Sequence, residues 1–227
     1  MQAVILAGGL GTRLREKVSD KPKPMAEFSN KPLLAYLIEQ LKEFEEIIIL
    51  IGYKGDVIKN YFGDGSKFGI PIRYSEEEEP LGTGGALKKA QDLIKGDFIL
   101  INGDNYHELN YKELKKIKEN TMILTKTINP TQVTIIKTDI NGKVTELKER
   151  PKEPTPDDKY MNAGILVLKK EVLKLLPEGK SSMELIIFPE LVKLGLKTII
   201  YKGYYIDIGT PENYDKFMEY QKNNPLK

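Results

Sequence analysis

The apolar residues of the first half of the chain fall into short continuous runs separated by stretches with helical periodicity. Residues 3–7 and 47–51 are continuous apolar runs, which is typical of strands buried on both faces of a sheet. Between them, the apolar positions of residues 34–41 recur at the spacing of one helix face, after Pro32 in a first-turn position. The same pattern predicts strands at residues 70–74 and 98–101 and helices at residues 56–61 and 86–94.

This alternation of strand and helix predicts an α/β fold with a mostly parallel central sheet and helices on both faces, in three layers. In such sheets, ligands bind beyond the carboxyl ends of the strands. Two polar features follow buried strands in this way, the glycine-rich segment of residues 8–13 and Asp104. The pattern therefore directs attention to that edge of the sheet.

The second half of the chain has a different pattern. Asn141 and Gly142 are flanked by residues 132–137 and 143–148, which is a strong signal for a β-hairpin. Thr210 followed by Pro211 is typical of a helix N-cap and first turn. We also expect a strand at residues 162–168 and helices at residues 169–176 and 183–194. We predict a single domain over residues 1–227, with halves at residues 1–110 and 111–227.

Composition narrows the function classes. The net charge is +2, from 35 basic and 33 acidic residues, and no basic block gives a reason to expect nucleic acid as a partner. The chain has no cysteine, so disulfides, thiolate metal sites and a cysteine nucleophile are excluded. No stretch approaches the roughly 20 apolar residues of a membrane span, so we expect no membrane partner. A cytoplasmic location fits these features.

The segment of residues 6–25 is the strongest candidate for chemistry. Its glycines, Gly8, Gly9 and Gly11, follow a buried strand and would let backbone N–H groups approach phosphate oxygens closely. Arg13 can clamp phosphate oxygens, and Lys23 lies between two prolines that stiffen its backbone. A P-loop does not match, because its lysine is missing, and the dinucleotide-binding pattern fails because leucine stands at its third glycine position.

The same segment resembles the signature of the sugar-nucleotide pyrophosphorylases, a nucleotidyltransferase family in which a G-G-x-G-x-R loop precedes P-K-P. Further motifs extend this resemblance over nearly the whole chain, and the pattern is also similar to that of the D-glycero-D-manno-heptose 1-phosphate guanylyltransferases. Mannose 1-phosphate guanylyltransferases are similar too. The motifs in chain order are LAGGLGTRLREKVSDKPKPM (6–25), EEEPLGTGGA (77–86), NGD (102–104), ERP (149–151), NAGI (162–165) and DIGTP (207–211).

The resemblance implies a Rossmann-like α/β/α nucleotidyltransferase fold and an Mg²⁺-dependent transfer of NMP from an NTP to a sugar 1-phosphate, with pyrophosphate as the second product. Such an enzyme serves nucleotide-sugar biosynthesis, here for capsule or surface polysaccharide. The halves at residues 1–110 and 111–227 would bind the nucleotide and the sugar phosphate. The oligomeric state is left open, with a homodimer as one option.

The resemblance also assigns roles to individual residues. Catalytic roles fall to Arg13, Lys23 and Asp104, and Asp104 with Asp207 would hold the metal. The nucleotide would be bound by Leu6, Ala7, Gly8, Gly9, Gly11, Thr12, Arg13, Glu79, Leu81, Gly82 and Thr83, and the sugar phosphate by Gly103, Glu149, Arg150, Asn162 and Gly164.

Some of these positions carry further expectations. Glu79 could accept hydrogen bonds from guanine, which favours GTP, since a carboxylate only accepts. The neighbouring Glu76 and Glu77 are expected to be solvated. Arg150 stands where most relatives have lysine, which keeps the charge but changes the geometry. His107, the only histidine, is expected at the surface or in a turn.

Two other functions stay open at this point. One is a cytidylyl- or uridylyltransferase that acts on another sugar phosphate or on a non-sugar phosphate such as phosphocholine. The run from Asp104 to Tyr106 is similar to one found in phosphocholine cytidylyltransferases, although residues 79–85 have the sugar-type form. The other is a non-catalytic nucleotide-sugar sensor on the same scaffold.

Overall fold

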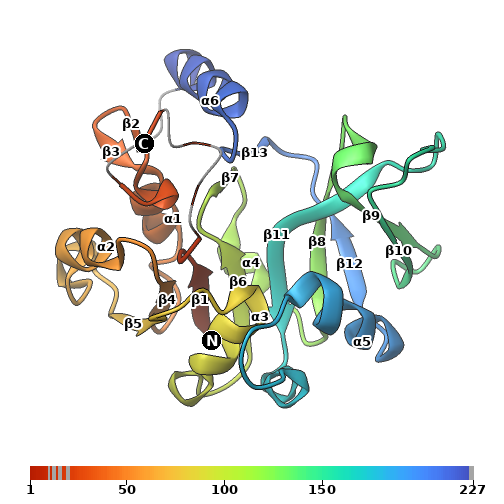
Figure 1. The fold of residues 1–227 in the computed structure, drawn as a ribbon, viewed down its shortest axis with the longest axis horizontal. Coiled ribbons are helices and arrows are strands. Elements are labelled where there is room, and N and C mark those ends of the chain that lie inside the picture. Colours follow the sequence, from red (N-terminus) through yellow and green to blue (C-terminus); the bar gives the residue numbers. More distant parts are fainter. Residues whose placement is uncertain (10, 12–13, 15–16, 19–20, 225–227) are drawn as a thin grey trace.

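A nine-stranded mixed sheet forms the centre of the molecule. The computed structural model describes residues 1–9, 11, 14, 17–18 and 21–224, so Thr12 and Arg13 lie outside the described residues. Seven strands follow the order β10-β9-β11-β6-β1-β4-β5, and β8 joins β11 to β12 (Figure 1).

The strands around β1 are parallel. β1 (Gln2–Leu6) pairs in parallel with β4 (Ile47–Ile51) and with β6 (Phe98–Asn102), and β4 pairs in parallel with β5 (Ile72–Glu76). The predicted strands of the first half are therefore confirmed, with β5 displaced by two residues. Because the strands run the same way, their carboxyl ends meet at one edge of the sheet.

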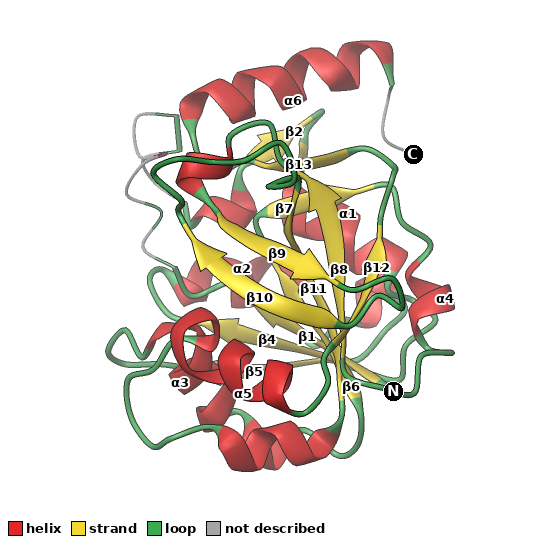
Figure 2. Ribbon diagram, turned by 90° about the vertical axis from the view of Figure 1, so that its right-hand side faces the viewer, coloured by secondary structure: helices red, strands yellow, loops and turns green. Residues whose placement is uncertain are grey.

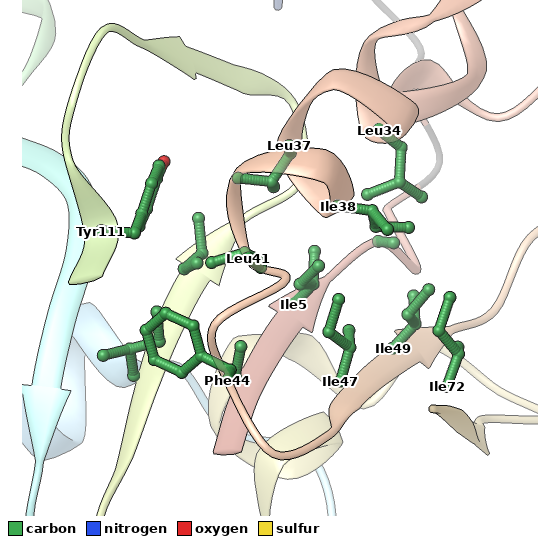
Figure 3. Packing of buried hydrophobic residues seen from close by; sticks show 14 of the residues in the cluster. Ile5, Leu34, Leu37, Ile38, Leu41, Phe44, Ile47, Ile49, Ile72 and Tyr111 are labelled. Carbon is green, nitrogen blue, oxygen red and sulfur yellow. The ribbon is translucent and has the colours of Figure 1, made fainter. Parts of the chain in front are cut away.

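The apolar runs form strands because both faces of the sheet are buried. Side chains alternate along a strand, so Ala3 and Ile5 of β1 join one core cluster while Val4 joins the other. In the close view, residues of the α1 helix lie over Ile5, Ile47 and Ile49 of the sheet (Figure 3).

Helices cover both faces. α1 (Leu33–Gln40) and α2 (Gly55–Phe62) contribute to the cluster around Ile5, while α3 (Gly82–Lys89) and α5 (Phe188–Lys193) contribute to the cluster around Val4 (Figure 2). This arrangement confirms the predicted three-layer α/β/α class.

The second half extends the sheet with antiparallel strands. β11 (Tyr160–Leu168) pairs antiparallel with β6, and the hairpin of β9 (Thr134–Thr138) and β10 (Val144–Glu149) continues the sheet beyond it. Gly142 has φ +72°, a conformation that glycine tolerates well in a hairpin turn. The predicted hairpin is confirmed. The pattern missed β8 (Thr121–Lys126) and β12 (Lys197–Ile200), which pair in parallel with each other.

Several predicted helices differ in detail. The helix expected at residues 86–94 is found as α3, which begins four residues earlier and ends at Lys89, followed by a short 3-10 helix at residues 91–93. The Gly84 and Gly85 N–H groups in its first turn donate to the Ser181 carbonyl. The helix expected at residues 169–176 is a 3-10 helix, and the one at 183–194 begins as a π-helical turn before α5. The short helices are η2 (Lys23–Met25), η3 (Ser66–Phe68), η4 (Gln91–Leu93), α4 (Tyr111–Leu114), η5 (Pro130–Gln132), η6 (Lys170–Leu175) and η7 (Met183–Ile187).

A third core lies beyond the carboxyl edge of the sheet. There β7 (Asn105–His107) pairs antiparallel with β13 (Tyr205–Asp207), and β2 (Glu27–Phe28) pairs with β3 (Lys31–Pro32). α6 (Pro211–Asn223) packs on these short strands through Phe217, and the centroid of its ring lies 4.7 Å from the ring centroid of Phe28. Among the described residues, no helix has the length and apolar character that crossing a membrane requires.

The N-cap of α6 can be tested by mutation. Thr210 accepts a hydrogen bond from the Asn213 N–H, as predicted for a threonine before a first-turn proline. We expect Thr210→Ala to lower the free energy of unfolding by about 1 kcal/mol, measured by urea denaturation. Thr210→Ser keeps the hydroxyl and should cost much less; equal losses in the two variants would contradict the capping role.

Candidate active site

The end of β1 is held close to the end of β6. The Leu6 carbonyl accepts a hydrogen bond of 2.9 Å from the Gly103 N–H, and the Ala7 N–H donates to the Leu50 carbonyl at 2.8 Å. A Cβ on Gly103 would lie 3.0 Å from the Leu6 oxygen, so a larger residue would push the two strands apart. The predicted site residues Leu6, Ala7 and Gly103 are thus brought together.

Glu77 packs against the first glycine of the loop, contrary to the expectation that it is solvated. Its Oε2 accepts from the Leu81 N–H at 3.0 Å, and its Oε1 occupies the space where a Cβ on Gly8 or Gly52 would lie. The side chain is half-buried, and this burial raises the pKa of Glu77. The carboxylate therefore ties the glycine loop to the start of α3.

The remainder of the loop approaches Lys23. Gly9 is exposed, and Gly11 has φ +57°, with its Cβ position 3.3 Å from the Cβ of Lys23. A side chain at Gly11 would be strained by that φ and crowded by that contact. Thr12 and Arg13, which were predicted to bind the nucleotide, lie outside the described residues.

Lys23 lies between the two aspartates that were predicted to bind metal. Its Nζ donates to the Oδ2 of Asp104 and lies 3.6 Å from the Oδ1 of Asp207. The lysine side chain is only 13% exposed, while the carboxylates are 28% and 41% exposed, so the group is partly open to solvent on the aspartate side. Three predicted residues distant in sequence therefore form one charged cluster.

Backbone contacts hold the aspartates at this position. Asn105 pairs with Asp207 across β7 and β13, and the Ile208 N–H donates to the Asp104 carbonyl at 3.1 Å. The Oδ1 of Asp207 accepts from the Gly209 N–H at 2.7 Å. A Cβ on Gly209 would lie 2.8 Å from that Oδ1 and 2.9 Å from the Lys23 Nζ, so a larger residue would displace the charged ends of the cluster.

The segment expected to contact the base and ribose, at residues 79–83, is hydrogen-bonded to residues 181–184. Gly82 and Thr83 begin α3 instead of forming a loop. The Thr83 hydroxyl donates to Glu184 at 2.9 Å and accepts from the Met183 N–H, while the Leu81 carbonyl accepts from the Ser181 N–H. Glu79, the predicted guanine contact, is exposed.

On the other side of β6, the NAGI motif forms an irregular part of β11. The Oδ1 of Asn162 accepts from the Gly164 N–H at 2.9 Å, and Gly164 has φ +75°. A Cβ on Gly164 would lie 2.3 Å from the amide nitrogen of Asn105 and 2.9 Å from that of Asn102. Three asparagines therefore surround the one position of β11 that requires glycine.

Glu149 and Arg150 lie farther along the sheet. They are exposed at the end of β10, which β9 and β11 separate from β6. Arg150 has φ +37°, unusual for a residue with a side chain. The loop after it is fixed by the buried carboxylate of Asp158, which forms ion pairs with Lys137 at 2.7 Å and Lys148 at 3.0 Å and accepts a hydrogen bond from the Thr155 N–H at 2.8 Å. These interactions lower the pKa of Asp158.

The expectation that His107 lies at the surface is wrong. The side chain is 1% exposed and lies 2.6 Å, through Nε2, from the carbonyl oxygen of Ala163, while Nδ1 lies 3.2 Å from the Tyr111 hydroxyl. Burial lowers the pKa of His107 to about 4, although the bond to Ala163 acts in the opposite direction. The ring is therefore neutral at physiological pH.

Sequence reasoning missed Glu77, Asn105, His107 and Gly209. Glu77 had one available signal, since it follows the carboxyl end of a predicted strand just as Asp104 does. Gly209 also had a signal, since it stands between Asp207, the predicted metal ligand, and Thr210, the predicted helix N-cap. Asn105 and His107 gave no local signal, because their importance arises from contact with β11, almost sixty residues away.

The three-layer fold and the charged cluster at the carboxyl edge of its sheet are those expected of a nucleotidyltransferase, and comparison with known sequences supports this class. The family model described as nucleotidyl transferase matches residues 2–223. The chain therefore belongs to the nucleotidyltransferase family, and it is an enzyme of that class.

Several named relatives cover almost all of this chain. A D-glycero-α-D-manno-heptose 1-phosphate guanylyltransferase from Campylobacter jejuni is 36% identical, over 96% of this chain and 99% of its own length. A probable mannose-1-phosphate guanylyltransferase from Oryza sativa is also 36% identical, but the match covers 94% of this chain and only 63% of that protein. The crystal structure of HddC from Yersinia pseudotuberculosis complexed with GMP-PN has a TM-score of 0.80 at 35% identity, covering 96% of this chain and 98% of that one.

The burial of His107 predicts a pH dependence of stability. The unfolded histidine takes up a proton below its ordinary pKa of about 6.5, whereas the folded one resists protonation down to about pH 4. This contribution to stability is complete above about pH 6.5 and is lost as the pH falls toward 4. Between pH 7 and pH 5, we expect wild-type protein to lose about 2 kcal/mol more free energy of unfolding than His107→Gln.

The measurement is urea denaturation of both proteins at the two pH values. An independent check is the imidazole Cε1–H signal, which is unambiguous because the chain has one histidine. A signal that titrates near pH 6.5 would contradict the burial of the neutral ring.

Proposed function

We propose that this chain transfers a nucleoside monophosphate from an NTP, with GTP favoured, to a sugar 1-phosphate such as D-glycero-D-manno-heptose 1-phosphate. The products would be an NDP-sugar and pyrophosphate. In this proposal, residues 1–110 bind the nucleotide and residues 111–227 bind the sugar phosphate, and the product serves the synthesis of a capsule or surface polysaccharide.

The observation that carries the proposal is the cluster of Lys23, Asp104 and Asp207 at the carboxyl edge of the sheet. It lies next to the glycine loop, because the Cβ position of Gly11 is 3.3 Å from the Cβ of Lys23. Cationic and anionic side chains are thus concentrated where an α/β sheet binds its ligand. A reaction between two phosphate esters needs such a place.

The two aspartates fit an Mg²⁺ ion. Both already face one cation, the Lys23 ammonium, and carboxylate oxygens are the ligands that Mg²⁺ prefers. Among the described residues, no group of three His, Cys, Asp or Glu side chains could hold a metal, so further ligands would come from nucleotide phosphate and water. When bound, the ion would neutralise phosphate charge and align the two substrates.

The chemistry asks for positioning more than for proton transfer. The second pKa of a phosphate monoester is about 6, so the acceptor phosphate is already an anionic nucleophile at neutral pH. One of its oxygens would bond to the α-phosphorus of the NTP, and the bond from that phosphorus to pyrophosphate would break. Lys23 would stabilise charge near the α-phosphate, and Arg13 would hold the departing pyrophosphate.

Two observations support the choice of GTP and of a heptose. Glu79 is exposed near the start of α3 and could accept from guanine N–H groups. The relative from Campylobacter jejuni is named for guanylyl transfer to a heptose, and the HddC structure holds GMP-PN. Asn162, Gly164, Glu149 and Arg150 are the proposed contacts of the sugar phosphate.

The direct experiment measures pyrophosphate release in the presence of Mg²⁺. The four common NTPs are each combined with heptose, mannose, glucose and N-acetylglucosamine 1-phosphates and with phosphocholine. We expect turnover with GTP and a sugar 1-phosphate. If pyrophosphate is released only with CTP and phosphocholine, the proposed nucleotide and acceptor are wrong. If no pair releases pyrophosphate but nucleotide binds tightly, the result favours a sensor.

Asp104 provides the sharpest test of the proposed metal site. Asp104→Asn keeps the size of the side chain but removes the negative charge, so we expect kcat to fall about 100-fold or more. Asp92→Asn, at an exposed position in η4, is the matched control and should keep full activity. Both variants should unfold at similar urea concentrations. Full activity of Asp104→Asn would contradict the site.

A further inference from the structure

β11 is interrupted at the point where it carries the NAGI motif. Its register with β8 shifts between Asn162 and Leu166, whereas its pairing with β6 is regular from Ile165 onward. Such an interruption re-aims a side chain and leaves backbone groups without their ladder partners. The carbonyl of Ala163 lies inside the interruption, so it needs donors from elsewhere.

Two side chains of β7 provide these donors. His107 Nε2 lies 2.6 Å from the Ala163 oxygen, and Asn105 Nδ2 donates to the same oxygen at 3.3 Å. Residues two apart on a strand point to the same side, which explains how both reach one carbonyl. Because a carbonyl only accepts, Nε2 carries the proton, and Nδ1 accepts from the Tyr111 hydroxyl at 3.2 Å.

These contacts lead to a role that the sequence motifs do not assign. We infer that Asn105 and His107 are positioning residues for the sugar 1-phosphate, because they hold the Ala163 carbonyl and so fix the interruption of β11 that orients Asn162. The inference rests on the proposed function, in which Asn162 contacts the acceptor.

The geometry explains why the position of Asn162 depends on this carbonyl. The side-chain Oδ1 of Asn162 accepts a hydrogen bond from the Gly164 N–H, so residues 162–164 form one local turn. Three residues of β11 stand between Asn162 and Leu166, whereas only one residue of β8 stands between their partners. If the turn relaxed into regular pairing, the register would shift by two residues and Asn162 would move about 7 Å along β8. Asn105 also fills the space beside Gly164, so a side chain at that position would collide with it.

The nucleotide side of the site does not depend on these contacts. The glycine loop is held by Gly103, Leu50 and Glu77, none of which bonds to Ala163 in the described structure. Loss of the His107 donor should therefore weaken binding of the acceptor and leave binding of the NTP nearly unchanged. A general loss of stability would affect both substrates.

The experiment compares three variants by steady-state kinetics, with the NTP and acceptor that wild-type protein uses best. His107→Phe removes the donor, and we expect the KM for the acceptor to rise about 10-fold while the KM for the NTP stays within about 2-fold. His107→Gln keeps a donor and should recover part of this loss. Tyr111→Phe leaves the bond to Ala163 intact and is the matched control, with little change in either KM.

Asn105→Ser keeps the test decisive if His107→Phe does not fold. It removes the longer bond to Ala163 and the 3.4 Å bond to the Tyr205 hydroxyl while His107 stays in place, and we expect a smaller rise in the KM for the acceptor alone. Equal changes in both KM values, or no change in the acceptor KM of any folded variant, would overturn the positioning role while the proposed function stands. Silence of wild-type protein with every acceptor would overturn the proposed function and this role with it.

Discussion

The arrangement of the site depends on placing two carboxylates side by side at the edge of a sheet. Like charges at short distance repel, so Asp104 and Asp207 need a cation between them, and Lys23 provides it in the structure. The backbone provides the rest, through the pairing of β7 with β13 and the hydrogen bond from Ile208 to the Asp104 carbonyl. This strand pairing brings Asp207 close to Asp104 despite the repulsion between the two carboxylates.

The position of Lys23 has a consequence for the proposed metal. The ammonium already occupies the space that faces both carboxylates, so an ion that binds there would share or displace it. An incoming polyanionic nucleotide provides an alternative partner for the lysine, which can then leave the aspartates. Nucleotide and metal would therefore favour each other's binding, since each removes a cost of binding the other.

The parts of the structure that sequence predicts are those with local causes. Buried parallel strands must be apolar on both faces, so β1, β4 and β6 were recognisable from their residues alone. The Thr210 cap and the Gly142 turn follow from the conformations of single residues. The resemblance to a known family then identified Lys23, Asp104 and Asp207, which the structure brings together, although their roles stay predictions.

Features with distant causes were missed or misjudged. β8 carries Thr121 and Thr125 among its apolar residues and is a strand because β11 and β12 pair with it. His107 looked like a polar residue in a turn, yet it is buried because the Ala163 carbonyl offers it a partner.

Burying an imidazole is unfavourable unless its nitrogens are satisfied, and here the neutral ring has a carbonyl on one side and a hydroxyl on the other. Such an arrangement, in direct contact with the irregular part of β11 in the proposed acceptor site, is not explained by stability alone. A leucine would fill the same space at lower cost, but it would leave the carbonyl with only the longer bond from Asn105 and would weaken the support of the turn at Asn162.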